Sequence, residues 1–333
     1  MPQKLIRWGV AGTGRMADTF TPDFEVVADA EVIAVGSRRQ QSADEFARRH
    51  GIARAHGTYR ALIDDPEVDA IYIVTPHPQH LVLAKAAIEA GKAILVEKAF
   101  TATAAGAREV ADLACERGVF CMEAMWTRFQ PTVVRARQLI ADGAIGEVQQ
   151  VQADLGAYRP YNPDDRLFSP SLGGGATLDL GVYVISIAQH FLGTPETLRA
   201  RGTKYPNGVD ASVNVFMEYD NGRSASVIAS LQTASAGRAV IYGTAGSIEL
   251  EPRFHHPTSL ILRRNGVDPE RISDPHDGRG YAHEIAEVDQ CLRHGHTESD
   301  VMPLADTVAV ARMMQETLMQ LGIETAEDRS FTL

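Results

Sequence analysis

The chain has 333 residues, about twice the size of a typical domain, which predicts two packed domains and excludes a single small module. Hydrophobic residues make up 44% and charged residues 23%, close to the globular average, so the composition excludes a disordered, collagen-like or coiled-coil chain. The formal charge of −11 would repel phosphate backbones and anionic lipid, which argues against a nucleic-acid or membrane partner.

The three cysteines, Cys115, Cys121 and Cys291, lie far from any Cys-x-x-Cys spacing, so neither a disulfide framework nor a thiolate metal site is indicated. Residues 5–10 form too short and too interrupted an apolar stretch for the core of a signal peptide. No apolar run approaches the ~20 residues that span a bilayer. These features predict a protein of a reduced compartment, the cytoplasm.

In the first third of the chain, short runs rich in Val and Ile alternate with helix-like stretches. The predicted strands are 5–10, 31–35, 70–75, 93–96 and 119–122, and the predicted helices are 42–50, 79–90 and 104–117. Apolar runs without alternation suit strands covered on both faces, and strands alternating with helices imply a parallel sheet. We therefore predict a doubly wound Rossmann domain over residues 1–122.

The pattern then changes to longer strand-like segments joined by turns. The predicted strands are 147–155, 211–219, 223–231 and 238–241, and the predicted helices are 131–142, 176–191, 280–293 and 303–321. Asp220-Asn221-Gly222 has the composition of a hairpin turn between two of these strands. Residues 123–333 are therefore predicted to form an α/β domain with an open, mostly antiparallel sheet.

The first predicted strand leads directly into Gly12-Thr13-Gly14-Arg15-Met16-Ala17, the G-x-G-x-x-A form of the dinucleotide fingerprint. Gly12 permits the tight turn, Gly14 leaves room for the pyrophosphate, and Ala17 lets the helix approach the strand. The hexapeptide alone is a weak signal, but its position between a strand and a helix is the context that supports it.

The end of the second strand should determine the choice of cofactor, because NAD enzymes place an acidic residue there to bind the ribose 2′-hydroxyl. This chain has Gly36-Ser37-Arg38-Arg39 instead. Ser37 can donate to a 2′-phosphate and Arg38 can pair with it in a bidentate manner, which favours NADP(H) over NAD(H). The alternative is that both arginines are solvated charges at a strand end.

Further candidate residues follow the other strands and occupy one later helix. Loops 75–80, 97–100 and 123–129 leave the carboxyl edge of the sheet, where ligands of open α/β sheets bind. Asp179 and Tyr183 are four residues apart and should share a helix face. A tyrosine can transfer protons near neutrality if an ammonium stabilises its phenolate, and Lys98 is the candidate ammonium. Taken alone, Tyr183 would be interpreted as a structural residue of a packing helix.

The combination resembles the Gfo/Idh/MocA oxidoreductase family over essentially the whole chain. The matching segments are Gly12–Gly14, Glu97–Lys98 at the position of the family's Glu-Lys-Pro, residues 126–129 and residues 173–183. Within the family, segments 77–80, 122–129 and 178–183 are most similar to the dimeric dihydrodiol dehydrogenase-like branch. Two departures are Ala99 in place of the usual proline and Tyr183 where many members have histidine.

The resemblance implies that Lys98 and Tyr183 are catalytic, with Asp179 supporting them, and that the open sheet of the second domain forms a homodimer contact. Together with the motifs it predicts these cofactor-binding residues: Gly12, Thr13, Gly14, Arg15, Met16, Ser37, Arg38, Thr75, Pro76, His77, His80, Glu97, Lys98, Trp126 and Arg128. The predicted substrate pocket comprises Trp126, Tyr158, Arg166, Phe168, Asp179 and Tyr183. The implied activity is hydride exchange between NADP(H) and a secondary alcohol or carbonyl of a diol, sugar or polyol.

Other motifs in the chain bear on two other classes of protein, metal enzymes and P-loop proteins. His255-His256 and His294-x-His296 lack a set of three or four convergent ligands, so we expect surface histidines and no metal. Gly173-Gly174-Gly175 lacks the Lys and Ser/Thr of a P-loop. A sugar or inositol oxidoreductase, or a non-catalytic NADP-sensing regulator on the same fold, stays open as an alternative.

Overall fold

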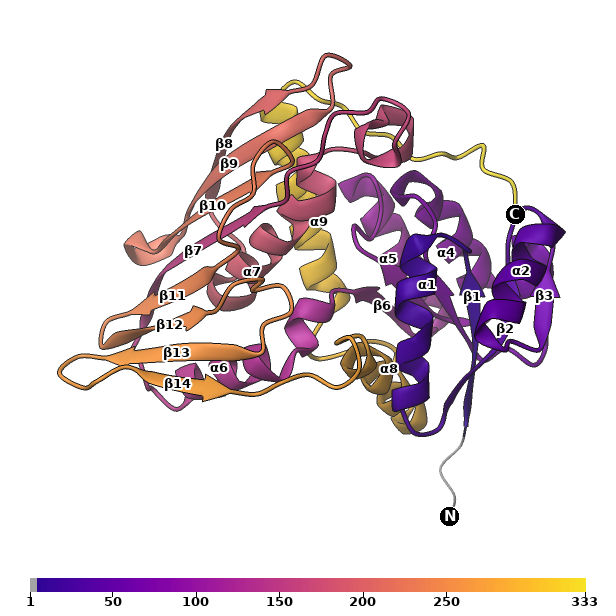
Figure 1. Cartoon of the computed structure of the whole chain (residues 1–333), viewed down its shortest axis with the longest axis horizontal. Coiled ribbons are helices and arrows are strands. Elements are labelled where there is room, and N and C mark those ends of the chain that lie inside the picture. The colour runs from indigo at the N-terminus through magenta and orange to yellow at the C-terminus, as the bar shows by residue number, and fades with distance from the viewer. Residues whose placement is uncertain (1–4) are drawn as a thin grey trace. The chain divides into compact units, whose positions relative to one another are not determined.

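The computed structural model describes residues 5–333, and the chain divides into two compact units (Figure 1). Unit 1 contains the chain up to Met125 together with Asp277–Val308 and Ala326–Leu333, and unit 2 contains Trp126–His276 and Ala309–Thr325. This division differs from a single cut near residue 122, because two C-terminal segments return to unit 1.

Unit 1 contains a parallel sheet with the strand order β3-β2-β1-β4-β5-β6. The strands are β1 (Ile6–Ala11), β2 (Ala30–Gly36), β3 (Arg54–His56), β4 (Ala70–Ile73), β5 (Ala93–Glu97) and β6 (Cys121–Ala124). The strand order reverses between β1 and β4, so the predicted doubly wound parallel sheet is confirmed. Strand β3 was not among the predicted strands, because it is three residues long and carries two polar side chains.

Helices of unit 1 cover both faces of this sheet. They are α1 (Arg15–Phe20), α2 (Gln40–His50), α3 (Tyr59–Ile63), α4 (His80–Glu89), α5 (Ala104–Arg117) and α8 (Ala282–His294). Aromatic rings lie at one of the two interfaces, where Phe20 stacks on Tyr72 of β4 at a centroid distance of 3.9 Å and packs at a tilt against Tyr281 at 5.0 Å.

Helix α8 belongs to unit 1 because buried polar contacts connect it to the sheet. The Trp8 indole on β1 donates to Oδ1 of Asp289 on α8 at 3.0 Å. The carboxylate of Asp23, in the 3₁₀ segment after α1, accepts from the backbone N–H groups of Tyr281 and Ala282 at the start of α8. Residues 277–308 therefore return to unit 1 and complete the core around its parallel sheet.

Unit 2 contains a larger sheet with the order β14-β13-β12-β11-β7-β10-β9-β8. The strands are β7 (Val148–Gly156), β8 (Thr197–Lys204), β9 (Asp210–Glu218), β10 (Ser224–Ser230), β11 (Ala239–Gly243), β12 (Gly246–Leu250), β13 (Ser259–Arg264) and β14 (Glu270–Ser273). Among these pairs only β7 and β10 run parallel, which confirms the mostly antiparallel prediction. The hairpin turn lies at Asp220–Gly222 as predicted.

The remaining helices are α6 (Pro131–Ala141), α7 (Val182–Leu192) and α9 (Leu304–Gln320), which begins in unit 1 and continues in unit 2. Helix α7 packs on β7 and β10 and covers one face of the sheet (Figure 1). The other face shows outward side chains such as Phe216 and Ile228, each 43% exposed. This half-covered sheet explains the alternation of buried and exposed residues along β9 and β10.

A π-helical turn, Thr177–Gly181, leads into α7, and the Val182 N–H donates to the carbonyl of Thr177 five residues earlier.

The stretch Pro170–Leu192 is long and apolar enough to cross a membrane, which corrects the expectation that no such run exists. In its most apolar window 72% of the residues are buried inside the structure, since they pack against the sheet of unit 2.

Candidate active site

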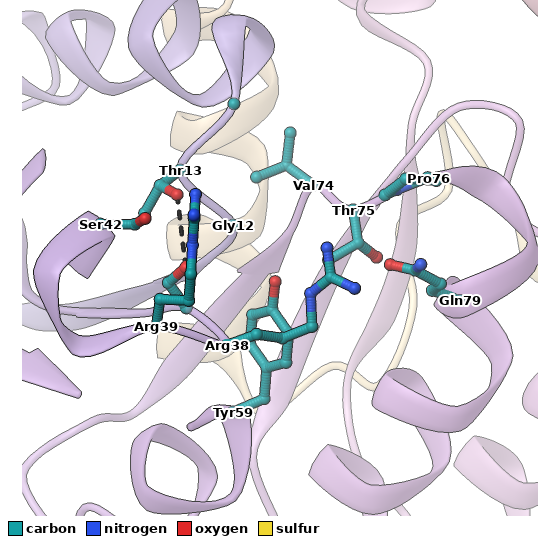
Figure 2. Close-up of a pocket in the computed structure, with 12 residues that line it drawn as sticks. Gly12, Thr13, Arg38, Arg39, Ser42, Tyr59, Val74, Thr75, Pro76 and Gln79 are labelled. Atoms are coloured by element: carbon teal, nitrogen blue, oxygen red, sulfur yellow. Dashed lines mark hydrogen bonds between the residues drawn. The ribbon is translucent and has the colours of Figure 1, made fainter. Parts of the chain in front are cut away.

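A cavity of about 460 Å³ lies in unit 1 where β1, β2 and β4 end (Figure 2). It is lined by Gly12, Thr13, Gly14, Ser37, Arg38, Arg39, Ser42, Tyr59, Val74, Thr75, Pro76 and Gln79. The position is the switch point of the parallel sheet, where open α/β sheets bind ligands outside the carboxyl ends of their strands.

Two glycines shape the floor of this cavity. Gly12 has a φ of +138°, and a Cβ there would lie 2.9 Å from the carbonyl oxygen of Val74. At Gly14, the N-cap residue of α1, an added Cβ would meet nothing within 4 Å. Gly12 is therefore required for close backbone packing, whereas Gly14 keeps open the space beside the backbone that an extended diphosphate needs.

The rim of the cavity carries two arginines and no acidic side chain among its lining residues. Arg38 extends toward Thr75, and Arg39 extends toward Thr13 (Figure 2). Ser37 is buried, and its hydroxyl lies 3.4 Å from that of Thr13. Two guanidinium groups beside a hydroxyl pair suit an anionic group such as a phosphate.

Five lining residues were not in the predicted set: Arg39, Ser42, Tyr59, Val74 and Gln79. Three of these are chain neighbours of predicted residues, so extending each motif by one or two positions would have found them. Ser42 on α2 and Tyr59 on α3 carry no local signal, because only the fold brings those helices to the cavity. Burial raises the pKa of Tyr59, although the nearby charge of Arg38 opposes the shift.

Other predicted cofactor residues of unit 1 lie outside the lining of this cavity. Arg15 and Met16 occupy the first turn of α1. The His80 ring is fully buried, with Nε2 2.7 Å from the Thr75 carbonyl oxygen and Nδ1 3.1 Å from that of Ala99. His80 thus joins the loop after β4 to the loop after β5, and it neighbours the buried His77 at a ring distance of 5.9 Å.

Lys98 follows β5, and the carboxylate of Glu97 holds the backbone beside it. The Tyr72 hydroxyl donates to Glu97 at 2.7 Å, and the Lys98 N–H donates to the same carboxylate at 3.1 Å. The Lys98–Ala99 peptide bond is cis. Glu284 of α8 is fully buried nearby, and both burial and the charge of Glu97 raise the pKa of Glu284 well above its ordinary value.

In unit 2, a buried carboxylate fixes the start of the helix that carries Asp179 and Tyr183. The backbone N–H and the hydroxyl of Thr177 both donate to Asp210 of β9, at 2.6 and 2.7 Å. Asp179 accepts from Arg166 at 3.2 Å. The prediction placed Asp179 and Tyr183 on one face of a regular α-helix. In the structure Asp179 lies in the π-helical turn and Tyr183 in α7, so the spacing between them is not that of a regular α-helix.

Aromatic and imidazole rings surround Tyr183 within unit 2. The His255 ring lies 5.1 Å from Tyr183 and 5.8 Å from Trp126, and His256 lies 5.0 Å from Trp126. The expectation of surface histidines is confirmed for His294 and His296, which are exposed, and is wrong for His255 and His256, which are half-buried. The Thr127 hydroxyl donates to the His255 carbonyl and holds residues 254–257 inward. Burial lowers the pKa of His256 to about 4, which keeps this imidazole neutral at pH 7.

Three other predicted site residues of unit 2 are a buried arginine, a core phenylalanine and an exposed tyrosine. Arg128, predicted to bind cofactor, is 1% exposed, and its guanidinium donates to Ser186 and Gln189 of α7. Phe168, predicted to line the substrate pocket, is part of a buried core cluster, and its ring packs edge-on against Tyr205. Tyr158 is 58% exposed.

No group of three or more His, Cys, Asp or Glu side chains that could hold a metal ion occurs in residues 5–333. The doubly wound sheet with an arginine-rimmed cavity at its switch point is the architecture of a dinucleotide-binding domain. Residues 6–125 match the oxidoreductase family with an NAD-binding Rossmann fold, and residues 133–249 match the GFO/IDH/MocA C-terminal domain. The chain therefore belongs to the Gfo/Idh/MocA family of NAD(P)-dependent oxidoreductases, which confirms the resemblance.

Curated relatives match the chain over nearly its full length. A trans-1,2-dihydrobenzene-1,2-diol dehydrogenase of Xenopus laevis is 34% identical over 326 residues, covering 95% of this chain and 98% of that protein. The enzyme of the same name from Homo sapiens is 32% identical, covering 97% and 99%. Among solved structures, a 3-ketoreductase from Actinomadura kijaniata in complex with NADP and TDP-benzene has a TM-score of 0.83 and 26% identity, covering 96% and 98%.

Proposed function

We propose that the protein transfers hydride between NADP(H) and a secondary alcohol or carbonyl group of a diol, sugar or related polyol. The observation that carries the cofactor choice is the arginine-lined end of β2, which has no acidic residue. The full-length similarity to diol dehydrogenases supports the substrate class. The predicted cytoplasmic location and homodimer belong to the same proposal.

The residues of the cavity fit a phosphorylated dinucleotide. Gly12 and Gly14 would hold the pyrophosphate against backbone N–H groups, because neither carries a side chain in the way. Ser37 and Arg38 would bind the 2′-phosphate, and Arg39 adds a second positive charge at the same rim. When bound, the nicotinamide cofactor supplies or accepts the hydride.

Tyr183 is the proposed proton-transfer group at its phenolic oxygen, with Lys98 lowering its pKa and binding the ribose or the substrate oxygen. Both assignments rest on the family resemblance. Asp179, paired with Arg166, would orient a substrate hydroxyl as a hydrogen-bond acceptor. The neutral imidazole of His256 and the ring of Trp126 add flat, weakly polar surfaces in unit 2, which suit the C–H face of a cyclic diol or sugar.

Two buried residues, His80 and Glu97, are proposed to position the loops after β4 and β5, and with them Lys98, without contacting the cofactor. His80 binds backbone carbonyls of both loops, and Glu97 binds the backbone N–H of Lys98. A side chain whose polar atoms are already directed to buried backbone groups acts by fixing loop geometry. His80 and Glu97, which were predicted to bind the cofactor directly, are therefore proposed to act as positioning residues.

The function is tested by incubating the purified protein with NADP⁺ and a panel of trans-dihydrodiols, sugars and inositols, with NADPH absorbance as the readout. Tyr183→Phe should abolish most turnover and leave NADPH affinity nearly unchanged. Tyr219→Phe removes another buried hydroxyl of unit 2, which donates to the sulfur of Met217, and should keep full activity. A Tyr183→Phe enzyme with wild-type rates would exclude Tyr183 as the proton-transfer group. Cofactor binding without turnover of any substrate in the panel would favour the non-catalytic regulator.

The cofactor preference is tested by comparing the dissociation constants of NADP⁺ and NAD⁺. Arg38→Ala should weaken NADP⁺ binding by about tenfold or more, since charge-assisted hydrogen bonds contribute roughly 1.5–3 kcal/mol. NAD⁺ binding should change little. Arg48→Ala on the exposed side of α2 is the matched control, because Arg48 does not line the cavity.

A sugar substrate is the second candidate, because the chain matches the models of the oxidoreductase family as a whole. The two candidates are separated by the ratio of kcat/KM values for a trans-dihydrodiol and for a cyclic sugar on the same preparation.

The proposed dimer uses the open face of the unit 2 sheet, where Phe216 and Ile228 are exposed. Sedimentation of a Phe216→Glu, Ile228→Glu variant as a monomer, beside a dimeric wild type, would support that contact.

A further inference from the structure

The last eight residues, Ala326–Leu333, belong to unit 1 and are fastened to it at several points. The carboxylate of Glu327 accepts from the backbone N–H and the hydroxyl of Thr103, each at 2.8 Å. The Asp328 N–H donates to the Pro78 carbonyl at 2.8 Å. The yellow C-terminal segment in Figure 1 then ends beside α2.

These anchors direct Phe331 to the arginine-lined end of the cavity. Its side chain is buried at 9% exposure, and its ring lies 5.7 Å from the ring of Tyr59, a cavity-lining residue. The guanidinium carbon of Arg38 lies 6.0 Å from the centroid of the Phe331 ring. Arg38 itself is exposed, so Phe331 provides an aromatic contact to an otherwise solvent-facing cation.

We propose that Phe331 is a positioning residue for NADP(H): the C-terminal segment holds its ring against Arg38 and Tyr59, and so fixes the arginine that binds the 2′-phosphate. The inference rests on the proposed role of Arg38 and extends it to a residue that is nearly 300 positions away in the sequence.

The physical reason is the conformational entropy of a long side chain. A free arginine loses rotamer freedom when it binds a phosphate, and a contact that already restricts the side chain lowers that cost. An aromatic ring near a guanidinium also attracts it through the negative charge of the ring face. Both effects act only on the cofactor that carries a 2′-phosphate, because NAD(H) offers Arg38 no such partner.

The experiment measures NADP⁺ and NAD⁺ dissociation constants for full-length variants at position 331. Phe331→Leu keeps an apolar side chain but removes the ring, and Phe331→Tyr keeps the ring. The leucine variant should bind NADP⁺ roughly two- to fivefold more weakly and NAD⁺ unchanged, the range that an exposed cation–π contact gives. The tyrosine variant should bind both cofactors like the wild type. Phe331→Met serves as a second non-aromatic variant if the leucine variant fails to fold.

Two further variants separate a specific effect from general loosening of the segment. Arg329→Ala removes the exposed ion pair with Glu109 on the same segment and should leave both dissociation constants unchanged. In an Arg38→Ala background, Phe331→Leu should have no additional effect, because the residue acts through that arginine.

Several outcomes would overturn the inference. They are equal weakening of NAD⁺ and NADP⁺ binding, wild-type NADP⁺ affinity in the leucine variant, or the same loss with and without Arg38. If the wild type prefers NADP⁺ and Arg38→Ala weakens NADP⁺ binding while Phe331→Leu leaves it unchanged, only the role of Phe331 fails. If the wild type has no preference for NADP⁺, the proposed cofactor choice fails as well.

Discussion

Replacing Asp289 by asparagine should stabilise the protein in a pH-dependent way. Asp289 is fully buried on α8, where Oδ1 accepts from the Trp8 indole and Oδ2 lies 3.6 Å from the Arg293 guanidinium. Burial raises the pKa of this carboxyl from 3.8 to about 7. Asparagine keeps an acceptor for Trp8 and the same shape, but it cannot ionise.

The sign and size of the effect follow from proton binding. Between pH 4 and 7 the folded protein keeps a proton on Asp289 that the unfolded chain has lost, so the free energy of unfolding falls as the pH rises through this window. A shift of about 3 pKa units corresponds to about 4 kcal/mol above pH 7. Over the practical range from pH 5 to pH 8, about 2–3 kcal/mol of that loss occurs.

The assay is urea unfolding of the wild type and Asp289→Asn at pH 5 and pH 8, followed by circular dichroism. The gain in unfolding free energy from the substitution should be about 2–3 kcal/mol larger at pH 8 than at pH 5. Asp112→Asn, at an exposed i,i+4 pair on α5, is the control and should show no such difference. An equal effect of Asp289→Asn at both pH values would refute a protonated Asp289.

Three other substitutions test separate parts of the site. Gly12→Ala should lower the unfolding free energy by about 2–3 kcal/mol and impair NADP⁺ binding in calorimetry, because its Cβ would press on the Val74 carbonyl at a positive φ. Asp210→Ala should cost about 2–4 kcal/mol in urea unfolding and reduce kcat, since two buried donors of Thr177 lose their acceptor. Phe168→Leu should lower stability by about 1 kcal/mol and leave KM unchanged; a raised KM would return Phe168 to the substrate pocket.

Local signals explain what the sequence could predict. Helix α5 was predicted at 104–117 and has those limits, because Thr103 caps its first turn and Gly118 ends it in the left-handed conformation. The strands β1, β4 and β5 are short buried apolar runs between such signals. The glycine fingerprint follows β1 directly, so the floor of the cavity was predictable from six consecutive residues.

The missed features depend on contacts between distant parts of the chain. His255 reaches Tyr183 across about 70 residues, and a pair of histidines in a loop resembles surface histidines until that contact is known. Phe168 is predicted to line the substrate pocket as one of several aromatic and cationic residues, and no local pattern shows that it belongs to a buried core cluster. No local pattern near Asp277 or Ala326 indicates that these segments return to the first unit.

The late position of α8 in the chain has a consequence for biosynthesis. Trp8, Phe20 and Tyr72 are synthesised early, yet the helix that covers this side of their sheet begins at Ala282. At about 5–20 residues per second, the ribosome needs roughly 10–30 s to add the ~160 residues between Met125 and α8. During that interval the side of the nascent Rossmann sheet that α8 later covers stays exposed, with the Trp8 indole still lacking its Asp289 partner.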